Sequence, residues 1–112
     1  MPHEIDGIQQ IDQEELQQLL KEKEGKIKFI DVREPEEYNA GHIPNVPLIP
    51  MNSIPQRLDE LDKDEEYVFI CRSGNRSHMV SRFLKQQGFE KVTNFNGGML
   101  SWRGDVKQGM EE

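Results

Sequence analysis

Cysteine is almost absent from this chain, which has one, Cys71, among its 112 residues. A single cysteine excludes a disulfide within the chain. It also excludes a second, resolving thiol, so an oxidised Cys71 must be discharged to another molecule. An unpaired thiol is typical of proteins in reducing compartments. The sequence therefore predicts a cytoplasmic protein.

Long apolar segments are also absent. The longest apolar run, residues 67–71, is far too short to span a bilayer. A signal peptide is not expected either, because the first residues read MPHEIDGIQQ and lack its basic and apolar regions. We therefore expect no association with a membrane.

Basic residues are outnumbered, with 14 Lys and Arg against 21 Asp and Glu, which gives a net charge of −7. This balance argues against nucleic-acid binding, which needs a basic surface. The 3 histidines are scattered, and with one cysteine they do not form a zinc site, so no metal is expected. A local positive site inside an acidic surface remains possible.

Apolar segments with strand character alternate with amphipathic ones along the chain. The pattern predicts strands at 8–11, 27–32 and 67–70, a last one at 92–95, and a weaker one at 46–49. Helical stretches are expected after Asp12, whose capping-box partner is Glu15, and at 36–40, 53–61, 77–87 and 99–102. This order predicts one α/β domain with a mostly parallel sheet of about five strands and helices on both faces. Its core covers roughly residues 6–103, and we expect the tail 104–112 to be frayed.

The most informative segment is residues 66–88, which read EYVFICRSGNRSHMVSRFLKQQG. An apolar strand leads into a loop that begins with Cys71, and a helix follows. The loop contains Arg72, Ser73, Gly74, Asn75 and Arg76, and Ser77 is expected to cap the helix. Helix N-termini and arginines both attract anions. A thiol held there should ionise easily, so Cys71 is predicted to be a reactive nucleophile that is open to reagents.

Three segments resemble the single-domain rhodaneses, which are thiosulfate sulfurtransferase-like proteins. They read DVREPEEYNAGHIP at 31–44, CRSGNRS at 71–77 and NGGMLSW at 96–102, in the order that the family has. The resemblance implies a rhodanese fold and a two-step sulfur transfer. The Cys71 thiolate would take the outer sulfur of an anionic donor such as thiosulfate and hold it as a persulfide. A small thiol or a protein would then accept that sulfur, and neither a metal nor an organic cofactor is needed.

The resemblance also implies roles for individual residues. Backbone N–H groups of residues 72–76 would point at the cysteine sulfur, while Arg72 and Arg76 would hold the donor. Asp31 would be a buried support that hydrogen-bonds the loop or an arginine, with Arg33 beside it, although the two could also form a simple surface pair. Residues 45–47 depart from the commonest family pattern, which has Gly-Ala at their start.

Other interpretations stay open. Cys71 alone could be an inert buried cysteine. Related dual-specificity phosphatases have a cysteine, five residues and then an arginine, but here Arg76 comes one residue too early and Ser77 takes that position. A loop of this length should be too tight for a phosphoryl group, so phosphatase or arsenate-reductase chemistry is disfavoured. A sulfur carrier without turnover, or a regulatory binding module on the same fold, remains an alternative.

Overall fold

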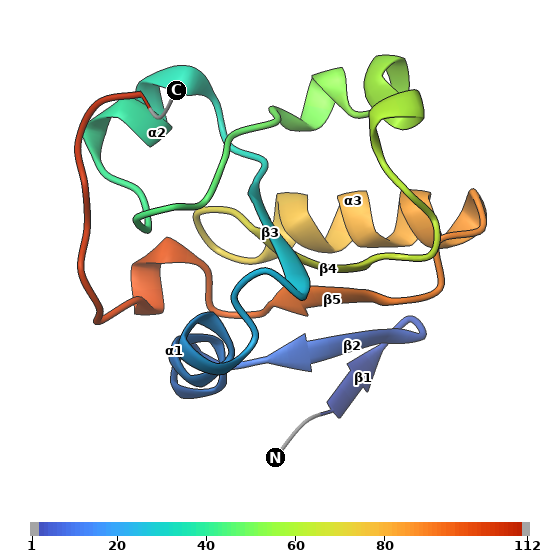
Figure 1. Ribbon diagram of the computed structural model, residues 1–112, viewed down its shortest axis with the longest axis horizontal. Coiled ribbons are helices and arrows are strands. Elements are labelled where there is room, and N and C mark those ends of the chain that lie inside the picture. The colour runs from blue at the N-terminus through green and yellow to red at the C-terminus, as the bar shows by residue number, and fades with distance from the viewer. Residues whose placement is uncertain (1–2, 111–112) are drawn as a thin grey trace.

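The computed structural model describes residues 3–110, and its centre is a five-stranded sheet (Figure 1). The strands are β1 (His3–Ile5), β2 (Ile8–Ile11), β3 (Ile27–Asp31), β4 (Glu66–Ile70) and β5 (Val92–Phe95). Their order is β1-β2-β5-β4-β3, with β2, β5, β4 and β3 parallel and β1 antiparallel to β2. The predicted fold class, with a mostly parallel sheet of about five strands, is confirmed.

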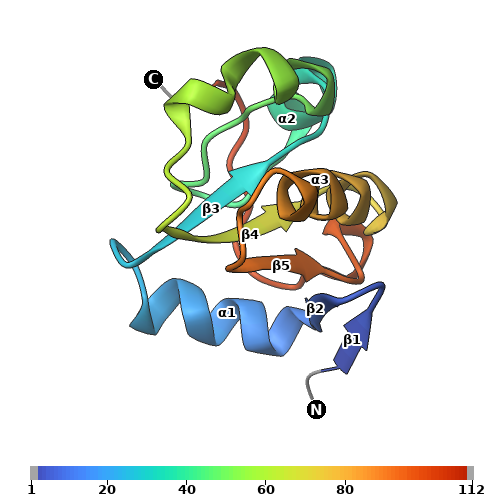
Figure 2. The ribbon, with the colours of Figure 1, turned by 90° about the vertical axis from the view of Figure 1, so that its right-hand side faces the viewer.

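Helices cover both faces of the sheet, as predicted (Figure 2). The helices are α1 (Gln13–Glu22), α2 (Pro35–Ala40) and α3 (Asn75–Gln86), with short 3₁₀ segments at Met51–Ser53, Pro55–Glu60 and Met99–Ser101. On β4, Tyr67 and Phe69 pack on the α3 face, while Val68 and Ile70 pack on the α1 face. The apolar run at 67–71 is therefore continuous because both of its faces are buried.

Two helix ends form as the sequence predicts. The Glu15 N–H donates to Asp12 Oδ1 at 2.8 Å and the Asp12 N–H donates to Glu15 Oε1 at 3.0 Å, which is the expected capping box of α1. The second is the C-terminal end of α3, where Gly88 has a φ of 99° and its N–H donates to the Lys85 carbonyl. The chain thereby leaves α3 in the left-handed conformation that glycine tolerates.

Several predicted elements differ in the structure. Residues 46–49 form no strand but a single bridge to β3, in which the Asp31 N–H donates to the Pro47 carbonyl at 2.9 Å and the Ile49 N–H donates back at 2.9 Å. Proline has no N–H, so it limits this pairing. Strand β1 was not predicted. Helix α3 begins at Asn75 behind the N-cap Gly74, so the expectation that Ser77 is the N-cap is wrong.

The expected fraying of the tail is not found over residues 104–110. His42 and Lys107 exchange both backbone hydrogen bonds, at 2.9 and 2.8 Å, and the Gly109 N–H donates to the Asn39 carbonyl at 3.0 Å. Figure 1 shows this last segment running back to α2. Residues 111–112 of the predicted tail lie outside the described residues. Within residues 3–110, no helix combines the length and the apolar character that crossing a membrane requires.

Candidate active site

Cys71 lies directly after β4, at the carboxyl end of the parallel strands, where ligands of such sheets commonly bind. The turn after β5 packs against the loop that Cys71 begins. The Met99 N–H donates to the Cys71 carbonyl at 2.8 Å, and the Leu100 N–H donates to the Arg72 carbonyl at 3.0 Å. These two bonds fix the start of the loop to the 3₁₀ segment after β5.

Two glycines allow the loop and the β5 turn to pack this closely. Gly74 has a φ of 98°, and a Cβ there would lie 1.9 Å from the Asn96 carbonyl oxygen. A Cβ on Gly98 would lie 2.4 Å from the Arg72 carbonyl oxygen. No larger residue fits either position without moving backbone, so both glycines are needed for the observed loop.

Two donors converge on the Cys71 sulfur. The Gly74 N–H donates to Sγ at 3.1 Å and the Ser77 hydroxyl lies 3.2 Å from Sγ. The resemblance implied N–H groups from all of residues 72–76, but Gly74 supplies the one backbone donor to Sγ found in the described chain. Ser77, in the first turn of α3, supplies a hydroxyl in place of the cap that was predicted.

The expectation that the Cys71 side chain lies open to reagents is wrong for this conformation. Cys71 is 0% exposed, and Gly74 and Ser77 are buried with it. The outer rim of the loop consists of Arg72, Ser73 and Asn75, which are exposed. A reagent can therefore reach the sulfur only when the atoms that cover it move.

The two arginines of the loop have different surroundings. Arg72 is exposed, and no ion pair involving it is found within residues 3–110. Arg76 is half-buried and its two terminal nitrogens lie 2.7 and 2.8 Å from the Glu37 carboxylate of α2. The hydrogen bonds from Arg76 lower the pKa of Glu37 to about 2. The same bonds, together with the negative charge of Glu37, raise the pKa of Arg76.

Asp31 and Arg33 form a buried pair, 1% and 5% exposed, so the surface-pair alternative is wrong. Arg33 Nε and Nη2 donate to the Asp31 carboxylate at 2.9 to 3.1 Å, and the Arg33 N–H donates to Asp31 Oδ1 at 3.0 Å. Arg33 Nη2 also donates to the Gly41 carbonyl at 2.8 Å. Asp31 thus holds an arginine, which was one of the two expected partners, and the pair braces the end of α2.

Sequence reasoning missed a chain of buried polar side chains behind Cys71. Asn94 Oδ1 accepts from the Ser77 hydroxyl, and Asn94 Nδ2 donates to Gln10 Oε1 at 2.8 Å. Gln10 Nε2 lies 3.2 Å from His78 Nδ1, and His78 Nε2 lies 2.9 Å from Asp6 Oδ2. Gln10 and Asn94 are 0% and 1% exposed. An amide inside a predicted strand with two covered faces was the available signal, because buried amides need partners.

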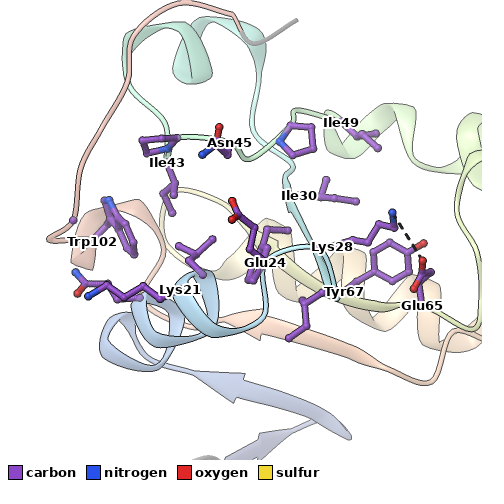
Figure 3. Close-up of a pocket in the computed structure, with 18 of the residues that line it drawn as sticks. Lys21, Glu24, Lys28, Ile30, Ile43, Asn45, Ile49, Glu65, Tyr67 and Trp102 are labelled. Atoms are coloured by element: carbon purple, nitrogen blue, oxygen red, sulfur yellow. Dashed lines mark ion pairs between the residues drawn. The ribbon is translucent and has the colours of Figure 1, made fainter.

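A groove of about 870 Å³ lies on another part of the molecule (Figure 3). It runs along β3 between the end of α1, the 43–47 segment and Trp102, and the Lys28–Glu65 ion pair of 3.9 Å crosses its rim. Its lining includes no residue of 71–77 in the described chain. The groove is therefore separate from the Cys71 site. No cluster of metal-ligating side chains is found within residues 3–110.

Comparison with known proteins places these features in a family. The sequence pattern of the rhodanese-like domain matches residues 12–105. The chain is 50% identical to the Bacillus subtilis protein YtwF, whose name proposes a sulfurtransferase, over 91 residues that cover 79% of this chain and 87% of YtwF. It is 40% identical to an Allochromatium vinosum sulfurtransferase over 95 residues, 85% of this chain and 88% of that protein. A crystal structure of a Staphylococcus aureus rhodanese-like domain protein superposes with a TM-score of 0.80 at 36% identity, covering 89% of this chain and 97% of that one.

Proposed function

Because the chain belongs to the rhodanese-like domain family, we propose that it is a sulfurtransferase that carries sulfane sulfur as a persulfide on Cys71. In the first step the Sγ thiolate attacks the outer sulfur of a donor such as thiosulfate. The sulfur–sulfur bond of the donor breaks, sulfite leaves with the electron pair, and Cys71 becomes a persulfide anion. In the second step an acceptor thiol or protein thiolate attacks the outer sulfur, and the Cys71 thiolate is released.

The observation that carries this proposal is the convergence of the Gly74 N–H and the Ser77 hydroxyl on Sγ, at 3.1 and 3.2 Å. Both donors belong to the start of α3, a helix of 12 residues whose N-terminus favours negative charge. Preorganised hydrogen-bond donors around Sγ stabilise the thiolate, which is present before sulfur is taken up and again after it is released. Arg76, in the first turn of the same helix, adds a positive charge beside the loop.

The surroundings of the loop suggest how the roles divide. Arg72, exposed on the rim, is the arginine available to bind an anionic donor, with Ser73 and Asn75 beside it. Both terminal nitrogens of Arg76 are held by Glu37, so Arg76 is less able than Arg72 to turn toward a donor. The Asp31–Arg33 pair supports α2, which carries Glu37.

Transfer also requires access, because Cys71 is 0% exposed. We infer that the rim opens to admit the donor, in the manner of the gating loops of other enzymes. The unpaired thiol favours a reducing compartment such as the cytoplasm.

The test is to load the protein with sulfur. Wild-type protein is incubated with thiosulfate, freed of excess reagent and weighed intact, before and after cyanide. We expect the mass of one added sulfur atom on the wild type, its loss with cyanide, and no gain on Cys71→Ser. The proposal fails if the wild type gains no cyanide-labile sulfur, or if Cys71→Ser gains it. Loading from a protein persulfide but not from thiosulfate would replace turnover with sulfur carriage.

A further inference from the structure

The Ser77 hydroxyl has one proton and two acceptors within reach. Its oxygen lies 3.2 Å from Cys71 Sγ and in a short hydrogen bond with Asn94 Oδ1. A hydroxyl donates one hydrogen bond at a time, so it serves one of these two acceptors fully. The direction of this one O–H bond therefore depends on where negative charge lies around Sγ.

The orientation of the Asn94 side chain is fixed by its other contacts. Its Nδ2 uses both protons, on Gln10 Oε1 at 2.8 Å and on the Gly74 carbonyl at 3.1 Å. Gln10 is fixed in turn, because its Nε2 donates to the Ile8 carbonyl at 3.0 Å and faces His78 Nδ1. Rotating the Asn94 amide would place oxygen against two acceptors. Oδ1 is thereby held toward Ser77.

We propose that Asn94 is a positioning residue that offers the Ser77 hydroxyl an alternative hydrogen-bond acceptor. The hydroxyl donates to Sγ when Cys71 is a free thiolate, and it donates to Asn94 Oδ1 when Cys71 is a persulfide. The inference rests on the proposed function. In the thiolate, the negative charge is on Sγ and attracts the hydroxyl proton. In the persulfide, the charge is on the outer sulfur and Sγ becomes a neutral, weak acceptor, so the proton returns to Oδ1. Ser77 keeps its proton throughout, and no bond other than those of sulfur transfer changes.

This arrangement has a consequence for the free energies of the two states. When Cys71 is a thiol or a persulfide, Asn94 Oδ1 keeps its hydrogen bond from the Ser77 hydroxyl. When Cys71 is a thiolate, the hydroxyl bonds to Sγ instead, and the buried Oδ1 loses its donor. A buried acceptor without a donor is unfavourable. Asn94 therefore favours the sulfur-loaded state over the empty thiolate, which would help the protein to retain sulfur until an acceptor arrives.

The charged groups around this site lie on five parts of the fold. Arg72 is on the loop, and Arg76 on α3 is paired with Glu37 on α2. The buried pair consists of Asp31, the last residue of β3, and Arg33. Behind Asn94, His78 on α3 pairs with Asp6 in the β1–β2 turn, which lowers the pKa of Asp6. A useful test must hold all of these constant and separate the Ser77–Asn94 contact from the bonds of Asn94 to Gln10 and the Gly74 carbonyl.

A double-mutant cycle meets this requirement. The formation of the thiolate is followed by its ultraviolet absorbance during a pH titration, with Cys71→Ser as the blank, and this measurement needs no access to the sulfur. Asn94→Leu should lower the midpoint by about one pH unit when Ser77 is present, because the hydroxyl is then left to Sγ. In the Ser77→Ala background the same substitution should have no effect on the midpoint. Equal shifts in the two backgrounds, or no shift in either, would overturn the proposal.

A second variant covers failure of Asn94→Leu to fold, which circular dichroism would show. Asn94→Asp keeps the shape and holds the Ser77 proton more firmly, so the midpoint should rise, and more with Ser77 present than in the Ser77→Ala background. An equal rise in both backgrounds counts against the proposal. In variants that load, Asn94→Leu should also shorten the lifetime of the persulfide toward cyanide severalfold. The titration is independent of sulfur transfer, so loss of the proposed function would be recognised separately.

Discussion

The Arg76 guanidinium and the Glu37 carboxylate meet in a two-pronged salt bridge of 2.7 and 2.8 Å, which joins the first turn of α3 to the first turn of α2. Each side chain is 29% exposed, so water screens the pair only in part. The bridge fixes the end of the Cys71 loop to a second helix. It also holds both terminal nitrogens of Arg76 toward Glu37, so turning this guanidinium toward a bound donor would break the bridge.

This bridge predicts a pH-dependent contribution to stability. Arg76 lowers the pKa of Glu37 from 4.5 to about 2. Because the folded-state pKa lies below the unfolded one, the contribution is full above pH 4.5 and is lost as the pH falls toward 2. Glu37→Gln should lower the free energy of unfolding by about 1 to 2 kcal/mol at neutral pH, after allowance for screening. Urea unfolding of both proteins at a series of pH values measures this difference.

The matched control is Glu36→Gln, which removes the same charge from the preceding position of α2, where the side chain is exposed. It should change the free energy of unfolding by less than about 0.5 kcal/mol. An equal loss in the two variants, or a Glu37→Gln loss that persists unchanged at pH 2, would show that the bridge does not stabilise the fold.

Arg72 should affect the binding of an anionic donor more than the chemistry that follows. Arg72→Ala removes the exposed guanidinium of the rim, and we expect KM for thiosulfate to rise about tenfold with a smaller change in kcat. Arg72→Lys keeps the charge but not the forked pair of N–H donors, so its KM should lie between those of the wild type and Arg72→Ala. Steady-state sulfur transfer to cyanide gives both constants.

Arg82→Ala is the control for Arg72, since it removes an exposed arginine farther along α3. If both variants raise KM equally, the effect comes from the overall charge of the protein and not from a contact at the loop. An unchanged KM in Arg72→Ala would assign donor binding to other groups.

Gly74 and Gly7 offer a paired test of how tightly the loop packs. Both have positive φ, 98° and 79°, but a Cβ would meet the Asn96 carbonyl oxygen at 1.9 Å in one case and nothing within 4 Å in the other. Gly7→Ala should therefore show only backbone strain, about 1 kcal/mol. Gly74→Ala adds a collision with backbone, and we expect a loss of more than about 3 kcal/mol. Chemical unfolding measures both, and similar losses would mean that the loop yields easily.

Much of the fold follows from local patterns that the sequence displays. Strands β2 to β5 were predicted because each contains apolar β-branched or aromatic residues and lies next to turn residues or a helix cap, as Asp12 after β2 shows. Strand β1 was missed because it has three residues, and it pairs through a turn at Asp6 and Gly7, both with positive φ. Local pattern is weak for so short a strand.

The site was predictable in its residues but not in its contacts. Cys71 and its loop are contiguous in the sequence, so they could be recognised together. The partner of Arg76 is 39 positions away, and that of Asn94 is 84 positions away at Gln10. Such pairings depend on the order of strands and on how helices cross them. The burial of Cys71 likewise depends on how tightly the loop closes, which composition does not reveal.

That burial leads to a prediction about reagents. At a pH where thiols are fully ionised, the alkylation of native Cys71 should be at least about tenfold slower than that of the same thiol in urea-unfolded protein, because the rim must open before iodoacetamide reaches Sγ. With one cysteine in the chain, intact mass follows the reaction without ambiguity. Glu37→Gln, which releases Arg76 from α2, should speed the native reaction severalfold, while Glu36→Gln should not. A native rate equal to the unfolded rate would mean that the thiol is open in solution, and the requirement for loop opening in sulfur transfer would then be withdrawn.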